Sequence, residues 1–510
     1  MLDVKTTERS SIEMNVELLI QYGLEHDFFQ EEDQTYMRNR LCDFLGLEGF
    51  QALVDLDSKK SITQLLKEIL EWAYEHGKVV STQSPYSELY DTALMNIMLP
   101  RPSDINKKFQ ALQKISSKEA MDWYYAFSKA SDYIKMDRIS KNKKWKVPSI
   151  YGDIDITINL SKPEKDPKAI EASAHQAPSG YPLCLLCYEN EGYAGRMDHP
   201  ARHSHRVINI ELNQEPWFIQ YSPYGYYTEH AIIVNKSHRP MKISKSTFIR
   251  LADFLDQYDH YFIGSNADLP LVGGSLLSHD HYQGGHYTMP MVGAEPILKF
   301  ELKQYLDVEA SWLKWPMSVI RLKSKNKEAL VAAAEWVRKT WAMYSDDELD
   351  IHANTESIKH HTITPIMRKN NLTYELDLVL RDNRKNEQYP EGIFHPHKEI
   401  HPIKKENIGL IEVMGLAVLP ARLDFVIHEL ADALTCNLTK EDLKLRNDLR
   451  EFSDLYEEML MLYKGSHTPE MAVKTVVGQT FVKGLEHCGV FKLDGSGMKG
   501  MQAFVEALNG

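Results

Sequence analysis

The sequence predicts an α+β protein in which a helical N-terminal region precedes two regions that combine antiparallel strands with helices. Three observations support this prediction. Residues 1–145 carry apolar side chains at helical spacing, the pattern changes to strict alternation near residue 150, and a second αβ pattern begins near residue 306. We therefore divide the chain of 510 residues into a helical region, 1–145, and two α+β halves, 146–305 and 306–510.

Composition and charge narrow the class of protein. Hydrophobic residues make up 43% of the chain and charged residues 26%, which is ordinary for a globular protein in water. The formal net charge of −13 argues against a general nucleic-acid binder. No apolar run approaches the roughly 18 residues of a membrane span, and residues 1–10 lack a signal-peptide core. Five cysteines argue against a disulfide framework, so we expect a cytoplasmic protein with no membrane partner.

In the helical region, two segments have the pattern of a helix start. Residues 10–13 and 61–64 each fit a capping box and each lead into an apolar stripe. Gly77 is the expected end of the second helix. The basic run 141–146 could meet phosphates, but we interpret it as a solvated loop between the helical region and the first half.

The two halves follow different orders of strands and helices. In the first, residues 153–160 alternate and predict a strand, and short β-rich runs at 207–212, 217–221 and 231–234 predict an antiparallel meander. A helix is expected at 246–262. In the second half we expect a helix at 328–344, strands at 372–380 and 409–417, and further helices after Thr439.

The segment 273–285 carries the strongest chemical signal. If it is extended, His279, His281 and Gln283 point the same way, and paired glycines on either side allow a ligand to approach the backbone. A neutral imidazole can attack phosphorus, and amide groups can hold the charge on the phosphoryl oxygens. The alternative is a histidine-rich turn whose side chains are satisfied within the protein. The segment lacks the ending of a phosphate-binding P-loop and the helical histidine spacing of a zinc protease.

A Cys-x-x-Cys pair, Cys184 and Cys187, forms a second constellation. Two thiolates at this spacing commonly make half of a tetrahedral zinc site. The alternative is two buried thiols in the apolar run 181–186. Because the sequence has no second Cys-x-x-Cys, histidines would have to complete any metal site.

The His-x-His-x-Gln pattern, after a meander and one helix, resembles the histidine-triad superfamily. Glutamine replaces the third histidine in its galactose-1-phosphate uridylyltransferase branch. The stretches 189–196 (ENEGYAGR), 374–381 (YELDLVLR) and 394–397 (FHPH) look like the second, bacterial class of that family. The resemblance extends over nearly the whole chain. It implies that both α+β regions are histidine-triad-like halves.

The resemblance implies a ping-pong reaction of galactose metabolism. UDP-glucose would give its uridylyl group to a histidine and release glucose-1-phosphate, and galactose-1-phosphate would then take the group to form UDP-galactose. By position the nucleophile is His281, and Gln283 would hydrogen-bond the phosphoryl oxygens. Three further positions would lie near the uridine and phosphates: Asn266, Gly274 and Ser275. The sequence departs from the better-known class, which has His-Pro-His, by placing Asp280 between the histidines.

The resemblance also implies metal ligands and a homodimer. A structural zinc would be held by Cys184, Cys187, His279 and His238, with His230 as the alternative to His238. His395-Pro-His397 resembles a structural metal cluster of the better-known class. A second metal is therefore expected in the C-terminal half, unless the histidines there face solvent: His360, His361, His395, His397 and His401. The sequence leaves open which arginine holds a sugar phosphate: Arg101, Arg138, Arg196, Arg202 or Arg206.

Two other functions compete with uridylyl transfer. One is a dinucleoside polyphosphate phosphorylase or hydrolase of the same superfamily, which would share His281 but would not require the C-terminal half. The other is a nucleotide-binding or metal-storing scaffold without catalysis. Such a scaffold would bind nucleotide but would keep no covalent label.

Overall fold

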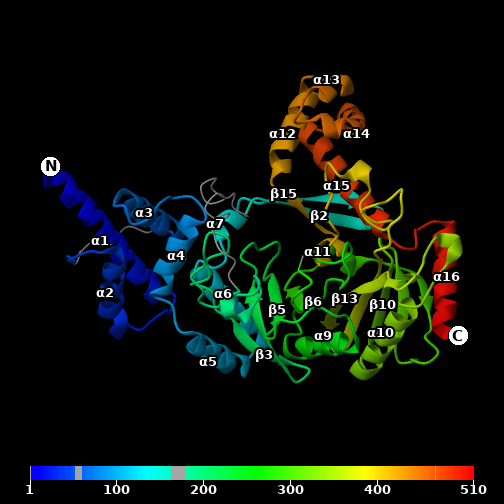
Figure 1. The fold of residues 1–510 in the computed structure, drawn as a ribbon, viewed down its shortest axis with the longest axis horizontal. Coiled ribbons are helices and arrows are strands. Elements are labelled where there is room, and N and C mark those ends of the chain that lie inside the picture. The colour runs from blue at the N-terminus through cyan, green and yellow to red at the C-terminus, as the bar shows by residue number, and fades with distance from the viewer. Residues whose placement is uncertain (1, 52–59, 162–179, 275, 466) are drawn as a thin grey trace.

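A computed structural model describes residues 2–51, 60–161, 180–274, 276–465 and 467–510. The N-terminal helices lie to one side of a large antiparallel sheet, and a group of C-terminal helices projects from another side (Figure 1). The predicted α+β class, with a helical N-terminal region before the antiparallel halves, is confirmed. Among the described residues, no helix combines the length and apolar character that crossing a membrane requires.

Seven helices precede the first strand among the described residues. They are α1 (Leu2–Glu25), α2 (Gln34–Leu45), α3 (Ile62–Glu75), α4 (Tyr86–Asn96), α5 (Pro102–Gln113), α6 (Ser117–Ala130) and α7 (Met136–Ile139). Ser61 caps α3, since its Oγ accepts a hydrogen bond from the N–H of Gln64 at 3.3 Å, but the full predicted capping box does not form because the Gln64 side chain donates to Glu68 instead. The predicted start at residues 10–13 is wrong, because α1 already begins at Leu2. Serine and glutamate are compatible with a helix interior, so the pattern alone does not define a start.

A three-stranded sheet has the order β1-β2-β15. Its strands are β1 (Lys143–Ser149), β2 (Gly152–Asn159) and β15 (Leu416–Pro420), with β1 antiparallel and β15 parallel to β2. The predicted loop at 141–146 is therefore largely strand. Its lysines are exposed on an edge strand, while Val147 enters the core and the Trp145 indole N–H donates to the carbonyl of Lys474 at 3.3 Å.

A ten-stranded antiparallel sheet has the order β3-β4-β5-β7-β6-β13-β14-β10-β9-β8. The five strands at one end of this order are β3 (Ile208–Leu212), β4 (Glu215–Tyr221), β5 (Ala231–Asn235), β6 (Phe262–Gly264) and β7 (His281–Gly285). The others are β8 (Pro296–Phe300), β9 (Glu309–Leu313), β10 (Val319–Ser324), β13 (His361–Asn370) and β14 (Thr373–Asp382), and β11 (Asn354–Thr355) pairs apart with β12 (Ile358–Lys359). The pairing of β6 with β13 joins the two halves into one sheet.

Helices α9 (Lys245–Gln257) and α10 (Lys327–Trp341) cover one face of this sheet (Figure 1). The predicted helix 246–262 is too long, because the chain enters β6 at Phe262. The predicted strand 409–417 is instead the short helix α11 (Leu410–Val413) followed by β15. The carboxylate of Glu412 accepts the N–H of Gly409 at 3.1 Å, which starts the helical turn within this apolar run.

The remaining helices follow β15. They are α12 (Arg422–Thr435), α13 (Lys440–Leu445), α14 (Ser453–Gly465), α15 (Pro469–Cys488) and α16 (Gly495–Asn509). The sequence pattern predicts helices after Thr439 but does not reveal α12. Apolar side chains of α12, α14 and α15 share a core with β2 and β15, and this core lies on the face of the large sheet that α9 and α10 leave free.

Candidate active site and metal cluster

Strand β7 presents its side chains alternately to the two faces of the large sheet. The Tyr282 hydroxyl lies 3.3 Å from Nη1 of Arg250, which belongs to α9. Its neighbours His281 and Gln283 therefore point to the opposite face. There they line a cavity of about 590 Å³ together with Asn266, Gly274 and several second-half residues between Lys404 and Glu412. The cavity thus lies where the two halves meet.

The position of one hydrogen atom on His281 follows from its surroundings. Its Nδ1 is 2.7 Å from the carbonyl oxygen of His279, and a carbonyl can only accept, so Nδ1 carries the hydrogen. In the neutral ring, Nε2 then keeps its lone pair. Burial lowers the pKa of His281 to about 4, so the imidazole is neutral at pH 7. A buried, neutral imidazole with one committed nitrogen is suited to act as a nucleophile.

Gln283 is held by a second histidine. The Nε2 of His230 lies 3.0 Å from the amide oxygen of Gln283, and His230 is buried. The ring of His230 is thus engaged with Gln283, and the fourth donor beside the cysteines is His238. The two histidines lie at opposite ends of β5, since His230 precedes this strand and His238 follows it. Strand β5 runs antiparallel to β7, with Val234 opposite His281 and Ala231 opposite Gly284. The end of β5 that leads to His238 is therefore the end beside His279.

The structure brings Asn266 and Gly274 together in the wall of the cavity. A Cβ on Gly274 would lie 2.7 Å from Nδ2 of Asn266, so only glycine allows this approach without a shift. The amide oxygen of Asn266 accepts the N–H of Leu410 at 2.8 Å and so connects the first half to α11. Asn266 therefore also has a structural partner. Ser275, the third predicted position, lies outside the described residues.

Two charged residues in the cavity wall were missed by sequence reasoning. Lys404 and Glu412 are both buried, and the Lys404 ammonium lies 2.8 Å from Oε1 of Glu412. Burial acts to lower the pKa of Lys404, but the attraction and hydrogen bonding of Glu412 and Glu406 together outweigh it and raise that pKa, so Lys404 stays charged. No sequence pattern marks them, because more than 120 residues separate them from His281. The five candidate arginines are absent from the described residues that line the cavity.

The cysteine pair meets two histidines next to this site. Cys184 Sγ lies 3.3 Å from Nδ1 of His279, and Cys187 Sγ lies 3.1 Å from Nδ1 of His238. All four donor atoms lie within 4.8 Å of one another. His279 donates from Nε2 to the carbonyl of Asn235 at 2.8 Å, which leaves the lone pair of Nδ1 toward the thiols. Tetrahedral zinc needs donor separations of roughly 3.3–3.8 Å, so this group can hold a metal ion.

His279 therefore does not face the cavity with the other two members of the predicted row. It stands just before β7, and its ring turns to the cysteines, whereas His281 and Gln283 line the cavity. The predicted row of His279, His281 and Gln283 is thus divided between the metal cluster and the cavity. One chain segment supplies both the metal cluster and the candidate nucleophile.

Asp280, between the two histidines, anchors this segment on the other face. Its carboxylate lies 3.2 Å from Nη2 of Arg239 and 3.8 Å from Nη1 of Arg250, and Glu215 contacts both arginines at 2.6 and 3.0 Å. The network fixes the position of Asp280 between the two histidines. It also ties the His279–His281 segment to Arg239, the residue after His238.

Comparisons with known proteins agree with this geometry. The N-terminal domain of galactose-1-phosphate uridyl transferase matches residues 27–240, and the C-terminal domain of the same family matches residues 254–447. Together the two matches contain the cysteine pair, the His-Asp-His segment and the cavity wall. The chain belongs to the galactose-1-phosphate uridylyltransferase family.

Relatives in this family align over nearly their whole length. The galactose-1-phosphate uridylyltransferase of Clostridium acetobutylicum is 47% identical, covering 98% of this chain and 100% of the relative. That of Bacillus subtilis is 45% identical, with 98% of each chain covered. Among solved structures, the yeast Ap4A phosphorylase Apa2 is 11% identical with a TM-score of 0.29, over 66% of this chain and 86% of that chain. A likeness this weak supports neither fold nor function.

The histidines that the uridylyltransferase resemblance marked in the C-terminal half do not gather at one point. His361 stacks on Trp341 with ring centroids 3.8 Å apart, and His395 contacts the amide oxygen of Asn407 at 3.1 Å. His397 instead lies with Glu399 and His487, three residues whose donor atoms could approach a metal.

Hydrogen bonds already occupy that second group. The backbone N–H of His397 donates to Nδ1 of His487 at 3.2 Å, so Nε2 of neutral His487 carries the hydrogen and faces Glu399 at 3.4 Å. A nitrogen that carries a hydrogen cannot ligate a metal. The second metal therefore stays a prediction without support from these contacts.

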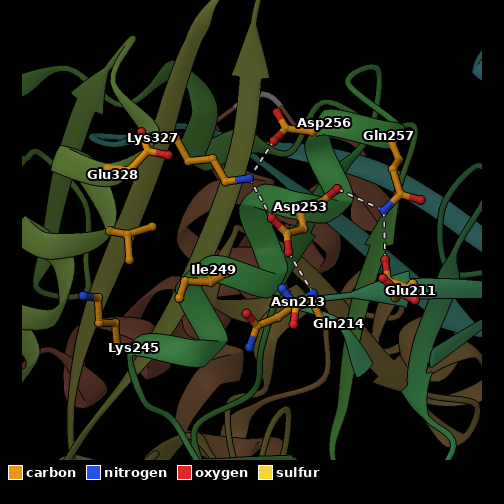
Figure 2. A pocket seen from close by; sticks show the side chains of 11 residues that line it. Glu211, Asn213, Gln214, Lys245, Ile249, Asp253, Asp256, Gln257, Lys327 and Glu328 are labelled. Carbon is orange, nitrogen blue, oxygen red and sulfur yellow. Dashed lines mark hydrogen bonds and ion pairs between the residues drawn. The ribbon is translucent and has the colours of Figure 1, made fainter. Parts of the chain in front are cut away.

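A second cavity, of about 620 Å³, lies between α9 and the start of α10 on the opposite face of the sheet. Figure 2 shows Lys327 reaching Asp253 and Asp256, at 2.6 and 2.7 Å, while Gln257 donates to backbone carbonyls of Glu211 and Asp253. Lys327 thus pairs with both aspartates and connects the start of α10 to α9. We assign the chemistry to the cavity around His281 and not to this one.

Proposed function

We propose that the chain catalyses uridylyl transfer between UDP-glucose and galactose-1-phosphate through a uridylyl-histidine at His281. The observation that supports this most directly is the 2.7 Å hydrogen bond from Nδ1 of His281 to the carbonyl of His279, which leaves Nε2 as the free nucleophile in a cavity between the two halves. Membership of the galactose-1-phosphate uridylyltransferase family supports the substrates.

In the first half-reaction, Nε2 of His281 attacks the α-phosphorus of UDP-glucose. The new N–P bond forms as the bond from that phosphorus to the bridging oxygen breaks, and glucose-1-phosphate leaves with the electron pair. The attacking ring becomes positively charged. The carbonyl of His279, which accepts its Nδ1–H, stabilises that charge without taking the proton. No proton transfer is needed in this step.

In the second half-reaction, a phosphate oxygen of galactose-1-phosphate attacks the same phosphorus, and the N–P bond breaks to restore neutral His281. Over the two half-reactions together, one phosphoanhydride bond is broken and another is formed. The overall exchange is therefore nearly balanced in energy between its forward and reverse directions. We propose that Gln283 and Lys404, which both line the cavity, hold the phosphoryl oxygens during both steps. Water must stay out, because it would hydrolyse the intermediate.

We propose that Cys184, Cys187, His238 and His279 hold zinc, because two thiolates and two imidazoles at these separations are the donors that tetrahedral zinc prefers. When bound, zinc would supply folding energy and a rigid link between the cysteine loop and β7. With four protein ligands the site would be closed to substrate, so its role would be structural.

Labelled substrates test the proposal. The protein is incubated with UDP-glucose labelled in the uracil, freed of small molecules, and examined for covalent label that acid removes and base does not. We expect about one label per chain, and release of the label as UDP-galactose on addition of galactose-1-phosphate. Turnover of diadenosine tetraphosphate without exchange would support the phosphorylase or hydrolase alternative. Binding of UDP-glucose without covalent label would support a scaffold.

A further inference from the structure

The amide of Gln283 can help in phosphoryl transfer only if the correct end faces the cavity. Its NH2 group can donate to a phosphoryl oxygen, whereas its carbonyl oxygen would repel one. The last torsion of a glutamine side chain is broad and nearly two-fold, so the side chain alone does not choose between these orientations. Another group must make the choice.

His230 is placed to make it. His230 stands two residues before Ile232, which is directly opposite Gln283 in the pairing of β5 with β7. It is therefore the diagonal neighbour of Gln283 on the same face, within reach of a long side chain. Its Nε2 lies 3.0 Å from Oε1 of Gln283.

The surroundings of His230 decide which nitrogen carries its hydrogen. Burial lowers its pKa to about 4, so the ring is neutral at pH 7. Its Nδ1 has no hydrogen-bond partner among the described residues. A buried N–H without a partner would be costly, so the hydrogen belongs on Nε2, where it donates to Gln283. That donation holds the amide oxygen of Gln283 and leaves its NH2 group for the cavity.

Two tyrosines hold the ring of His230 in place. The ring centroid of Tyr227 lies 4.5 Å away and that of Tyr226 lies 5.3 Å away. The Tyr227 hydroxyl also donates to the carbonyl of Gly284 at 3.1 Å, which ties it to the residue after Gln283. The imidazole therefore has little freedom to turn away from the amide.

We propose that His230 is a positioning residue that sets the orientation of the Gln283 amide for uridylyl transfer. This inference rests on the proposed function. His230 is absent from the described residues that line the cavity, so its effect on the rate passes through Gln283.

The test is a double-mutant cycle on the full-length protein, with single-turnover rates for both half-reactions. Gln283→Ala is expected to slow transfer by about 10²–10³ while UDP-glucose still binds. In His230→Met the new side chain is about as large as glutamine but has no hydrogen-bond donor. This variant should slow both half-reactions by about tenfold or more, with a similar KM. His230→Gln should recover most of the rate, because its amide can donate to the same oxygen. In the Gln283→Ala background, His230→Met should change the rate by less than about twofold.

The pair of His205 and Gln220 is a matched control for the pair of His230 and Gln283. His205 makes the same contact with Gln220, from Nε2 to the amide oxygen at 2.9 Å, and it is also buried and stacked on a tyrosine, Tyr133. Gln220 is absent from the described residues that line the cavity. His205→Met should therefore lower thermal stability about as much as His230→Met, with a change in kcat of less than about twofold.

Each outcome decides the inference. Equal rate losses from His230→Met with and without Gln283 would overturn it, and so would a His230→Gln variant as slow as His230→Met. If His230→Met does not fold, His230→Asn replaces it, since its amide is too short to reach Gln283 and the same loss is expected. If the unaltered protein takes no label from UDP-glucose, the proposed function itself fails. If the protein takes the label but the effects of the His230 and Gln283 substitutions on the rate are additive, the proposed function stands and only the role of His230 is overturned.

Discussion

The carbonyl oxygen of His279 accepts the Nδ1–H of His281 at 2.7 Å, while the ring of the same His279 lies 3.3 Å from the sulfur of Cys184. One residue thus contributes its backbone to the candidate nucleophile and its side chain to the metal cluster. Any shift of the metal ligands moves the carbonyl that fixes the tautomer of His281. The stability of the cluster and the chemistry of the nucleophile are therefore linked through two atoms of His279.

Removing the His281 ring should abolish exchange but leave a cavity in its place. In His281→Gly no covalent intermediate can form, and the neighbouring amide and lysine remain. Added imidazole, or a preformed uridine phosphoimidazolide, should therefore restore transfer to galactose-1-phosphate. The measurement is the rate of UDP-galactose formation with and without the added compound.

His279→Gly is the matched variant, two residues away on the same segment. It loses a metal ligand and should not be rescued by imidazole. Rescue of the His279 variant alone would reverse the assignment of the nucleophile. Full activity in His281→Gly would end the covalent mechanism.

Protein purified without added metal should contain about one zinc per chain. Cys184→Ser should lose that zinc and unfold at a lower temperature, because a closed metal site contributes folding energy. The ratio of activities toward different hexose phosphates should stay unchanged, since the cluster does not face the cavity. Cys436→Ser, at an exposed cysteine, serves as the control. Active protein with no bound metal would contradict the assignment.

Asp280→Ala should destabilise the His279–His281 segment. It leaves the buried guanidinium of Arg250 with one carboxylate partner, Glu215, in place of two. We expect a loss of about 1–3 kcal/mol in the free energy of unfolding, together with weaker zinc retention because Arg239 follows His238. Asp448, in an exposed ion pair with Arg446, provides the control, and Asp448→Ala should give no measurable change in urea unfolding. Equal effects of the two substitutions would rule out the anchoring role.

Asp91 on α4 should make stability depend on pH. Burial raises its pKa to about 7; Lys135 opposes this shift and Asp132 adds to it. Between about pH 4 and 7 the folded protein then binds a proton that the unfolded chain does not, so this residue's contribution to stability falls as the pH rises. Asp91→Asn should therefore stabilise the protein relative to the original by more than about 1 kcal/mol at pH 8 but not at pH 4. A difference that stays constant with pH would contradict the shift.

Sequence reasoning identified the groups whose geometry is local. Alternation along a strand put His281 and Gln283 on one side, and the Cys-x-x-Cys spacing brought two sulfurs together, because both depend only on neighbours in the chain. Sequence reasoning failed where a contact with a distant residue accompanies a change in local structure. The run 409–417 reads as an apolar strand, but a tertiary contact between Asn266 and Leu410 accompanies a helical turn there.

The choice between His230 and His238 shows what only the tertiary structure decided. The two histidines stand at opposite ends of β5, and the sequence comparison favoured His238 but left His230 as an alternative. The antiparallel register of β5 against β7 places the later one beside the cysteines and the earlier one beside Gln283. Lys404 and Glu412 likewise reach the cavity only because β6 pairs with β13 and joins the halves. Spacing along the chain specifies which side chains neighbour one another locally, whereas register and packing between distant segments determine which of them meet.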